Sequence, residues 1–377
     1  MTTAGIYIHI PFCNVKCMYC DFYSVADRNQ DQPQFFEALI KEINRFDFSS
    51  ITEQFDTLFI GGGTPSLMQP LQLELILKAL SDKIEISGLT EITMEVNPGE
   101  APYDKLVEFY SLGINRLSIG VQSLEPSLLT FLTRIHSVKD VFTSFKSARK
   151  AGFTNINCDI IFNIPGQTKQ ILQRDLKTII DLEPEHISTY SLTVEHGTKL
   201  NKLVSAGEVL MPSIEVDAEM YQMTREILSA NGFEQYEISN FSKSGKECLH
   251  NLHYWHIEPY IGFGPSAHSF DGSRRWNNVR LLDQYMKKID EDLSPISTSE
   301  DLTLIQKVNE NIGFGLRLNE GIDLDNFSEI HKKQFNQNVE QHRNKWDGCI
   351  DKVGNKIKLN EKGIAFADAI AVDLFLQ

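Results

Sequence analysis

The sequence predicts an α/β protein built from six strand–helix units, with a smaller domain after them. Strand-like segments lie at 5–12, 57–61, 91–97, 116–122, 155–162 and 186–193. Helix-like segments alternate with them at 33–48, 69–83, 102–112, 137–151 and 168–182, with apolar residues three and four positions apart. The strand-to-strand repeat of about 30–40 residues is typical of parallel strands joined by right-handed crossovers. Six such units form either a full sheet or an incomplete barrel.

Composition places the chain among ordinary globular proteins and restricts its partners. Its 377 residues are 41% hydrophobic and 23% charged, and a chain of this length normally forms more than one core. The net charge of −15 repels phosphate backbones, so nucleic acid is not expected as a partner. No apolar run reaches the roughly 18 residues that a membrane span needs. The chain opens Met-Thr-Thr-Ala without a signal segment, which predicts a cytoplasmic location with reduced thiols.

Three closely spaced cysteines follow the first predicted strand. Cys13, Cys17 and Cys20 form a C-x3-C-x2-C run, and the next cysteine is Cys158. Thiolates are soft ligands that favour iron–sulfur clusters, zinc or Cu(I). A cubane cluster takes four cysteines, so three would leave one iron open to a small molecule. Zinc remains the alternative, although a structural zinc site needs a fourth ligand and His9 lies on the strand.

Unusual residues stand where the next predicted strands end, as chemistry at the carboxyl ends of parallel strands requires. The second strand ends in the glycine run 61–63, whose small residues let backbone amides approach a ligand, although a flexible turn explains such a run equally well. Glu95 and Gln122 end the third and fourth strands. Asp159 lies inside an apolar strand, where a charge is costly unless it has a partner or ligand.

The cysteine segment resembles the cluster loop of a known family. Its residues, Tyr-Ile-His-Ile-Pro-Phe-Cys followed by Lys-Cys-Met-Tyr-Cys-Asp-Phe, are similar to those of radical S-adenosylmethionine (SAM) proteins and, more narrowly, of the oxygen-independent coproporphyrinogen oxidase family. The resemblance covers essentially the whole chain. It implies an incomplete (β/α)6 TIM-like barrel, a [4Fe–4S] cluster on the three cysteines, SAM on the open iron, and an electron donor such as a flavodoxin or ferredoxin. Asn163-Ile164 departs from the family's Gly-Leu and puts the detail of that loop in doubt.

The resemblance also assigns roles to further residues. Gly62, Gly63 and Thr64 belong to a motif that would pair with the SAM amino group, and Arg134 would neutralise the SAM carboxylate with its fork of donors. Without the resemblance, Arg134 would be taken as a solvated arginine at a helix end. The other expected contacts are Tyr7 beside the cluster, Tyr19 against adenine, Asp159 near the ribose, and Glu95 and Gln122 at SAM.

A second motif, His250-Asn-x-x-Tyr254-Trp255, combines ring nitrogens with flat aromatic surface. Histidine is a common axial ligand of haem iron, but a buried, hydrogen-bonded histidine among core aromatics is the alternative from the residues alone. We assign His253, His256, Cys248 and Cys349 to that alternative. By resemblance the motif is the haem site of a haem chaperone branch, on the outer part of the barrel mouth. The segment 262–269 is expected to be a turn and strand at the lower edge of the SAM cleft.

The predicted organisation has three parts. Residues 1–230 form the radical SAM barrel domain, 231–295 a capping segment with the His250 motif, and 296–377 a helical, winged-helix-like domain. In the last part we expect helices at 300–316 and 324–346, then a hairpin and an amphipathic helix.

Two functions of different classes compete. One is a haem chaperone that binds haem and hands it to an acceptor protein. The other is an oxygen-independent coproporphyrinogen III oxidase, which decarboxylates its substrate in haem biosynthesis; another radical enzyme acting on haem is a third possibility. By resemblance, the decarboxylating enzymes carry a fourth cysteine where Phe22 stands here, and an N-terminal arm before the cluster loop. Both differences favour the chaperone, and whether the protein is also an enzyme stays open.

Overall fold

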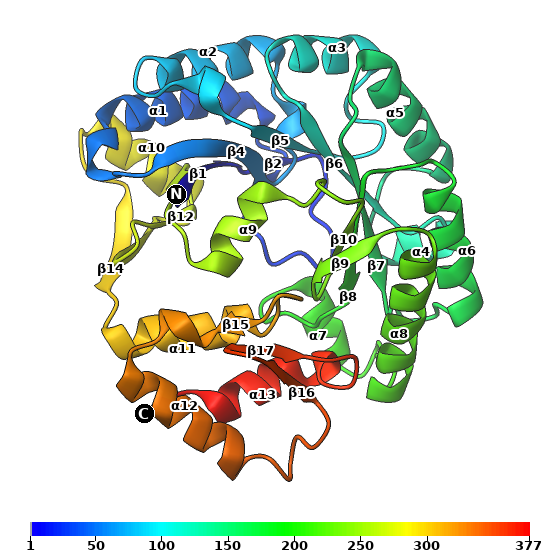
Figure 1. The fold of residues 1–377 in the computed structure, drawn as a ribbon. Coiled ribbons are helices and arrows are strands. Elements are labelled where there is room, and N and C mark those ends of the chain that lie inside the picture. The colour runs from blue at the N-terminus through cyan, green and yellow to red at the C-terminus, as the bar shows by residue number, and fades with distance from the viewer. Residues whose placement is uncertain (1) are drawn as a thin grey trace.

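The computed structural model describes residues 2–377 and contains a curved, open sheet of twelve strands (Figure 1). Six neighbouring parallel strands form its centre, as the sequence predicts. They are β1 (Thr3–Ile10), β4 (Gln54–Gly62), β5 (Glu91–Val96), β6 (Arg116–Gln122), β7 (Ile156–Phe162) and β8 (His186–Ser191). Their order in the sheet follows their order in the chain, so each crossover joins adjacent strands and all six carboxyl ends lie at one edge.

Helices cover the convex side of this sheet (Figure 1). They are α1 (Gln32–Arg45), α2 (Pro70–Ser81), α3 (Tyr103–Ser111), α5 (Val138–Ala151), α6 (Lys169–Ile180) and α8 (Ile214–Ala230). The apolar stripe expected on α1 is confirmed, because Phe35, Phe36, Leu39 and Ile43 are buried. These side chains pack with the strands in one large core. Short helices α4 (Pro126–Phe131) and α7 (Lys199–Ser205) and the strand pair β2 (Phe12–Cys13) and β3 (Val25–Ala26) complete the loops.

The sheet continues beyond the six strands at both edges. Beside β8 lie antiparallel β10 (Asn240–Ser242) and β9 (Glu234–Glu237). Beside β1 lie β11 (Tyr260–Phe263), which is parallel to it, and then antiparallel β12 (His268–Phe270), β13 (Arg274–Asn278) and β14 (Ile296–Asp301). The helix expected from residue 300 begins only at 304, because the Ser- and Thr-rich segment before it pairs with β13. The two ends of the sheet do not pair with each other, so the barrel is incomplete.

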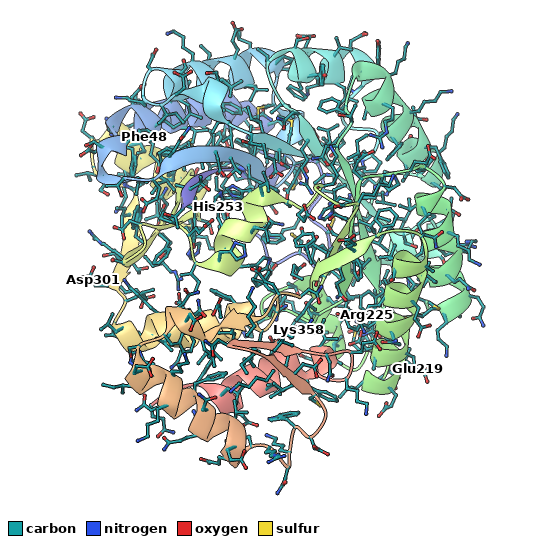
Figure 2. All side chains as sticks on the ribbon, in the orientation of Figure 1. Phe48, Glu219, Arg225, His253, Asp301 and Lys358 are labelled. Atoms are coloured by element: carbon teal, nitrogen blue, oxygen red, sulfur yellow. The ribbon has the colours of Figure 1, made fainter. Side chains whose placement is uncertain are left out.

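One helix lies on the concave side. α9 (Leu249–His256) contacts β1 and β4, and in Figure 2 the labelled His253 sits inside the arc of strands. The His253 ring lies 2.8 Å from an Asp56 oxygen and 2.7 Å from a Glu258 oxygen, and these carboxylates raise its pKa to about 9 against the effect of burial. His253 is thus the buried, hydrogen-bonded residue that the sequence predicts.

The C-terminal residues form a unit with its own core across the opening of the arc (Figure 1). Its elements are α11 (Leu304–Gly315), β15 (Ile322–Asp323), α12 (Glu329–Gln341), β16 (Ile350–Val353), β17 (Lys356–Leu359) and α13 (Ala367–Leu374). The expected hairpin and final helix are present as β16–β17 and α13. Within residues 2–377, no helix combines the length and apolar character needed to cross a membrane.

A buried glutamate ties the strands added beside β1, and the helix that follows them, to α1. Glu42 of α1 accepts hydrogen bonds from the amide of Gly264 (2.8 Å), Nδ2 of Asn278 (2.6 Å) and the hydroxyl of Tyr285 on α10 (Leu282–Asp290; 2.6 Å). Burial raises the pKa of Glu42 to about 7, although these three donors oppose the rise. The carboxyl group therefore becomes charged inside the protein near neutral pH.

This burial predicts a pH dependence of stability. Because the pKa of Glu42 is higher in the folded than in the unfolded state, its contribution is fully present below about pH 4.5 and is lost as pH rises through about 7. The full loss corresponds to about 3 kcal/mol. We expect the free energy of unfolding of the wild type to fall relative to that of Glu42→Gln between pH 5 and 8, as measured by urea denaturation. Parallel pH profiles for the two proteins would contradict the assignment.

Candidate functional site

The three cysteines lie on a loop that leaves β1 and is held by neighbouring backbone. Strand β2, which contains Cys13, pairs with β3, and the amide of Cys20 donates to the carbonyl of Cys17 at 3.3 Å. All three thiols are free, partly exposed, and line one cavity of about 150 Å³ together with Tyr19 and Arg134. The sequence therefore brings three soft ligands to a single cavity at the carboxyl edge of the sheet.

The donor set fits an iron–sulfur cluster. The Thr64 hydroxyl donates to Sγ of Cys13 at 3.5 Å, and Nη1 of Arg134 donates to Sγ of Cys17 at 3.6 Å. Burial raises the pKa of the Cys20 thiol to about 11, and a metal ion bound there would supply the positive charge that favours the thiolate. Over residues 2–377, no three His, Cys, Asp or Glu side chains already stand in the arrangement of a metal-ion site. The three thiols nevertheless line one cavity.

The glycine run at the end of β4 packs closely against the backbone of the cysteine loop and is not a flexible turn. A Cβ on Gly63 would lie 2.6 Å from the carbonyl oxygen of Phe12, and Gly62 has a φ of +113°. The amides of Gly63 and Thr64 donate to the carbonyls of Ile10 and Phe12, each at 2.7 Å. We expected these amides to approach a ligand; instead they hold the cluster loop, because the loop backbone passes directly over them.

Two carboxyl groups lie deeper, on the inner face of the sheet. Glu95 accepts a hydrogen bond from the amide of Gly62 at 3.0 Å, and burial together with Asp159 raises its pKa to about 7. Asp159 accepts from Ser118 (3.0 Å) and Asn157 (2.8 Å), yet burial raises its pKa as well. A cationic ligand beside two such buried carboxyl groups would lower their pKa values and so favour their charged form.

A cationic side chain, that of Arg134, also lies at this cavity. Arg134 donates to the side-chain oxygen of Asn97 and, at 2.9 Å, to the carbonyl of Gly120. A Cβ on Gly120 would lie 2.9 Å from Nε2 of Gln122 and 3.1 Å from Nη2 of Arg134, so both side chains crowd this glycine. Gln122 ends β6 with a φ of +65°, a left-handed conformation that is costly outside glycine and is common at functional sites. Arg134 is held inside the site and is not a solvated arginine.

The structure brings most of the predicted site residues together. Those that line the cavity are Cys13, Cys17, Tyr19, Cys20, Gly62, Gly63, Thr64, Glu95 and Arg134. Asp159 lies farther inside, whereas Tyr7 lines a separate cavity, and the charge of Glu95 contributes to raising the pKa of Tyr7. Sequence reasoning missed Asn97, which donates to Thr64 (2.9 Å) and Glu100 (2.8 Å), although Asn97 stands in the same motif as Glu95.

His250 lies elsewhere, and its expected position at the outer barrel mouth is wrong. The residue is fully buried beside Thr57, in the concave face, with its amide 3.2 Å from Glu91 at the start of β5. Nδ1 is 2.9 Å from the Thr57 hydroxyl and Nε2 is 2.8 Å from the Tyr254 hydroxyl. α9 turns this side chain inward, toward the amino ends of the strands. The segment 262–269 also lies outside the cluster cavity, because β11 and β12 belong to the sheet beyond β1.

Comparison with known proteins identifies the family. The chain matches the family model of the radical SAM superfamily over residues 7–179 and that of the HemN C-terminal domain over residues 302–366. The protein named heme chaperone HemW from Bacillus subtilis (strain 168) is 39% identical over 330 residues, 87% of each chain. The Danio rerio protein named radical S-adenosyl methionine domain-containing protein 1, mitochondrial, is 36% identical over 327 residues, 85% of this chain and 74% of its own.

A solved structure supports the fold. Coproporphyrinogen III oxidase (HemN) from Escherichia coli, described as a radical SAM enzyme, superposes with a TM-score of 0.86 over 99% of this chain and 90% of its own, at 23% identity. The likeness confirms the α/β fold with an incomplete barrel and a C-terminal unit. The chain therefore belongs to the radical SAM superfamily, in the family of the proteins named heme chaperone HemW.

Proposed function

We propose that this protein is a haem chaperone that binds haem and transfers it to an acceptor protein. The observation that carries the proposal is the 39% identity, over 87% of both chains, to a relative named heme chaperone HemW. Phe22 adds support, since by resemblance the decarboxylating enzymes have a cysteine there, and it lines the cavity of the three thiols with two-thirds of its surface exposed. His250 remains a proposed haem-site residue.

Membership of the radical SAM superfamily implies a [4Fe–4S] cluster and SAM. We assign Cys13, Cys17 and Cys20 to the cluster. When bound, the cluster and SAM supply one-electron chemistry. Glu95 is suited to an ammonium group and Arg134 to a carboxylate, because each would pair with the opposite charge in a partly dry cavity. Gly62 and Gly63 belong, by resemblance, to the motif that pairs with the ammonium group. The remaining proposed SAM contacts are Tyr7, Tyr19, Thr64, Gln122 and Asp159.

The wider setting is also proposed. An electron donor such as a flavodoxin or ferredoxin would reduce the cluster, and six free cysteines agree with a reducing compartment, the cytoplasm. We divide the chain into a barrel domain (1–230), a capping segment (231–295) and a C-terminal domain (296–377). The separate apolar core supports a C-terminal domain, although β14 at the start of this range pairs with β13 of the main sheet.

The cluster assignment predicts how the loss of one thiol changes the amount of iron that the protein binds. Cys17→Ser exchanges a soft ligand for a hard one in a site with three cysteines. After anaerobic reconstitution, we expect the variant to lose most of its bound iron and the broad visible absorption of the cluster. Cys349→Ser is the matched control, because Cys349 is a partly exposed cysteine of the C-terminal unit, and it should keep both. A full iron complement in Cys17→Ser would exclude the assignment.

The chaperone proposal predicts binding without turnover. Reconstituted protein titrated with haem should show a stoichiometric absorbance change. In parallel, the same protein supplied with coproporphyrinogen III, SAM and a reductant should form no protoporphyrinogen. Sustained product formation would instead identify a coproporphyrinogen oxidase that works without the fourth cysteine. Failure to bind haem at all would remove the chaperone function.

A further inference from the structure

A series of polar groups runs through the interior of the barrel from β7 to α9. Its members are Asp159 and Asn157 on β7, His186 on β8, Tyr236 on β9, and the backbone amide of Cys248 directly before α9 (Figure 1). We call these five groups the interior network. One end of it is a proposed SAM contact, and the other is the start of the helix that carries the proposed haem motif.

The interior network is continuous, because each group lies within hydrogen-bond distance of the next. Nδ2 of Asn157 donates to Asp159 at 2.8 Å, and Oδ1 of Asn157 lies 2.6 Å from Nδ1 of His186. Nε2 of His186 lies 2.8 Å from the hydroxyl of Tyr236, and this hydroxyl accepts from the amide of Cys248 at 3.3 Å.

The donors and acceptors of the interior network all point the same way. Asn157 turns its amino group to Asp159 and so presents its oxygen to His186. Burial and the charge of Arg116 lower the pKa of His186, so its ring is neutral and has one N–H. That hydrogen lies on Nδ1, because the Asn157 oxygen can only accept, and Nε2 then accepts from the Tyr236 hydroxyl. Hydrogen bonds aligned in this way polarise one another.

The charge on Asp159 controls the strength of the whole series. Burial raises the pKa of Asp159 and disfavours its charged form, although Asn157 and Arg116 oppose the rise. The sulfonium charge of a bound SAM would favour the carboxylate. A carboxylate accepts more strongly than a carboxylic acid, so its bond from Asn157 would strengthen, and with it each following bond up to the amide.

At its other end the interior network helps to hold the N-terminus of α9. Tyr236 accepts from the amide of Cys248, and Glu91 accepts from the next two amides, those of Leu249 and His250. The first amides of a helix have no partner within it, so these two groups satisfy them. The position of α9 over the strands therefore depends on the network as well as on Glu91.

In this position of α9 the His250 ring has two hydrogen-bond partners. Nδ1 is 2.9 Å from the Thr57 hydroxyl, and Nε2 is 2.8 Å from the Tyr254 hydroxyl. Coordination of iron through either nitrogen would replace one of these bonds. A firmer hold on the helix therefore favours the hydrogen-bonded state of His250 over a metal-bound state.

We propose that the interior network couples the SAM site to the haem motif, so that bound SAM lowers the affinity of α9 for haem and favours release to an acceptor. The proposal rests on the haem-chaperone function and on the haem role of His250 proposed above, and it adds the regulation of that site. His186 and Tyr236 are its positioning residues. Coupling between two binding sites is reciprocal, so bound haem should weaken SAM binding by the same factor.

The test compares haem titrations of full-length, anaerobically reconstituted protein with and without SAM, in the absence of a reductant so that SAM stays intact. In the wild type we expect SAM to raise the dissociation constant of haem about fivefold or more, which is the usual range of coupling between sites. In Tyr236→Phe, which lacks the hydroxyl between His186 and the Cys248 amide, the two constants should agree. Tyr285→Phe is the matched control, because it loses a buried hydroxyl bond to Glu42 and should keep the wild-type ratio.

The ratio of the two dissociation constants distinguishes coupling from other effects. A variant that only disturbs the fold changes both constants alike, and direct competition between SAM and haem for one space would persist in Tyr236→Phe. A wild-type ratio of one, or an unchanged ratio in Tyr236→Phe, overturns the proposal and leaves the chaperone function standing. A wild type that binds no haem removes the chaperone function itself.

Hydrogen exchange provides a readout that needs no haem and no variant. In the wild type, SAM should slow the exchange of the backbone amides of residues 248–256, because it strengthens the hold on α9. The amides of α12, in the C-terminal unit, should exchange at the same rate with and without SAM. Unchanged exchange over residues 248–256 would show that the network does not transmit SAM binding, and the proposal would fall.

Discussion

The structure depends on a buried carboxylate that holds α9 against the concave side of the sheet. Glu91, at the start of β5, accepts hydrogen bonds from the amides of Leu249 (3.0 Å) and His250 (3.2 Å), which are the first amides of that helix. These amides have no partner within the helix, and a negative charge at a helix N-terminus is favourable. Arg116 lies 3.9 Å away and is itself buried, so the charge is balanced inside the protein. Removing either partner would leave an uncompensated charge at the amino end of the barrel.

This anchor determines which side chains of α9 reach which surroundings. With its N-terminus fixed over Glu91, the helix directs His250 toward Thr57 and His253 toward Asp56. Tyr254 lines a cavity of about 360 Å³ together with Tyr7 and Tyr260, while His256 at the last turn reaches Glu320 of the C-terminal unit. A single helix of eight residues thus connects the barrel interior, this cavity and the C-terminal unit.

The alternating pattern predicted most of the fold because strands and helices here follow local periodicity. β6 occupies the residues that the sequence predicts, and α5 differs by one residue. The cavity of the three thiols was predictable for a different reason: the cysteines are close in sequence, and the other groups of the cavity stand at strand ends. The orientation of α9 was not, because a run with aromatic residues on every side has no face that local spacing can assign to the core. Asn97 was missed although its motif was recognised, since its partners Thr64 and Arg134 are distant in sequence.

The cluster loop forms a shared wall between two cavities. Cys13, Cys17 and Cys20 line the cavity at the carboxyl edge of the sheet. Asp21 and Tyr23 line the cavity that contains Tyr254, and Phe22 lines both. The loop is held from below by the glycine contact under Phe12 and from the side by His9, whose Nε2 lies 2.8 Å from the Tyr23 carbonyl. One of these contacts lies between backbone segments and the other joins the His9 ring to a backbone carbonyl, so the same stretch of loop backbone positions residues of both cavities.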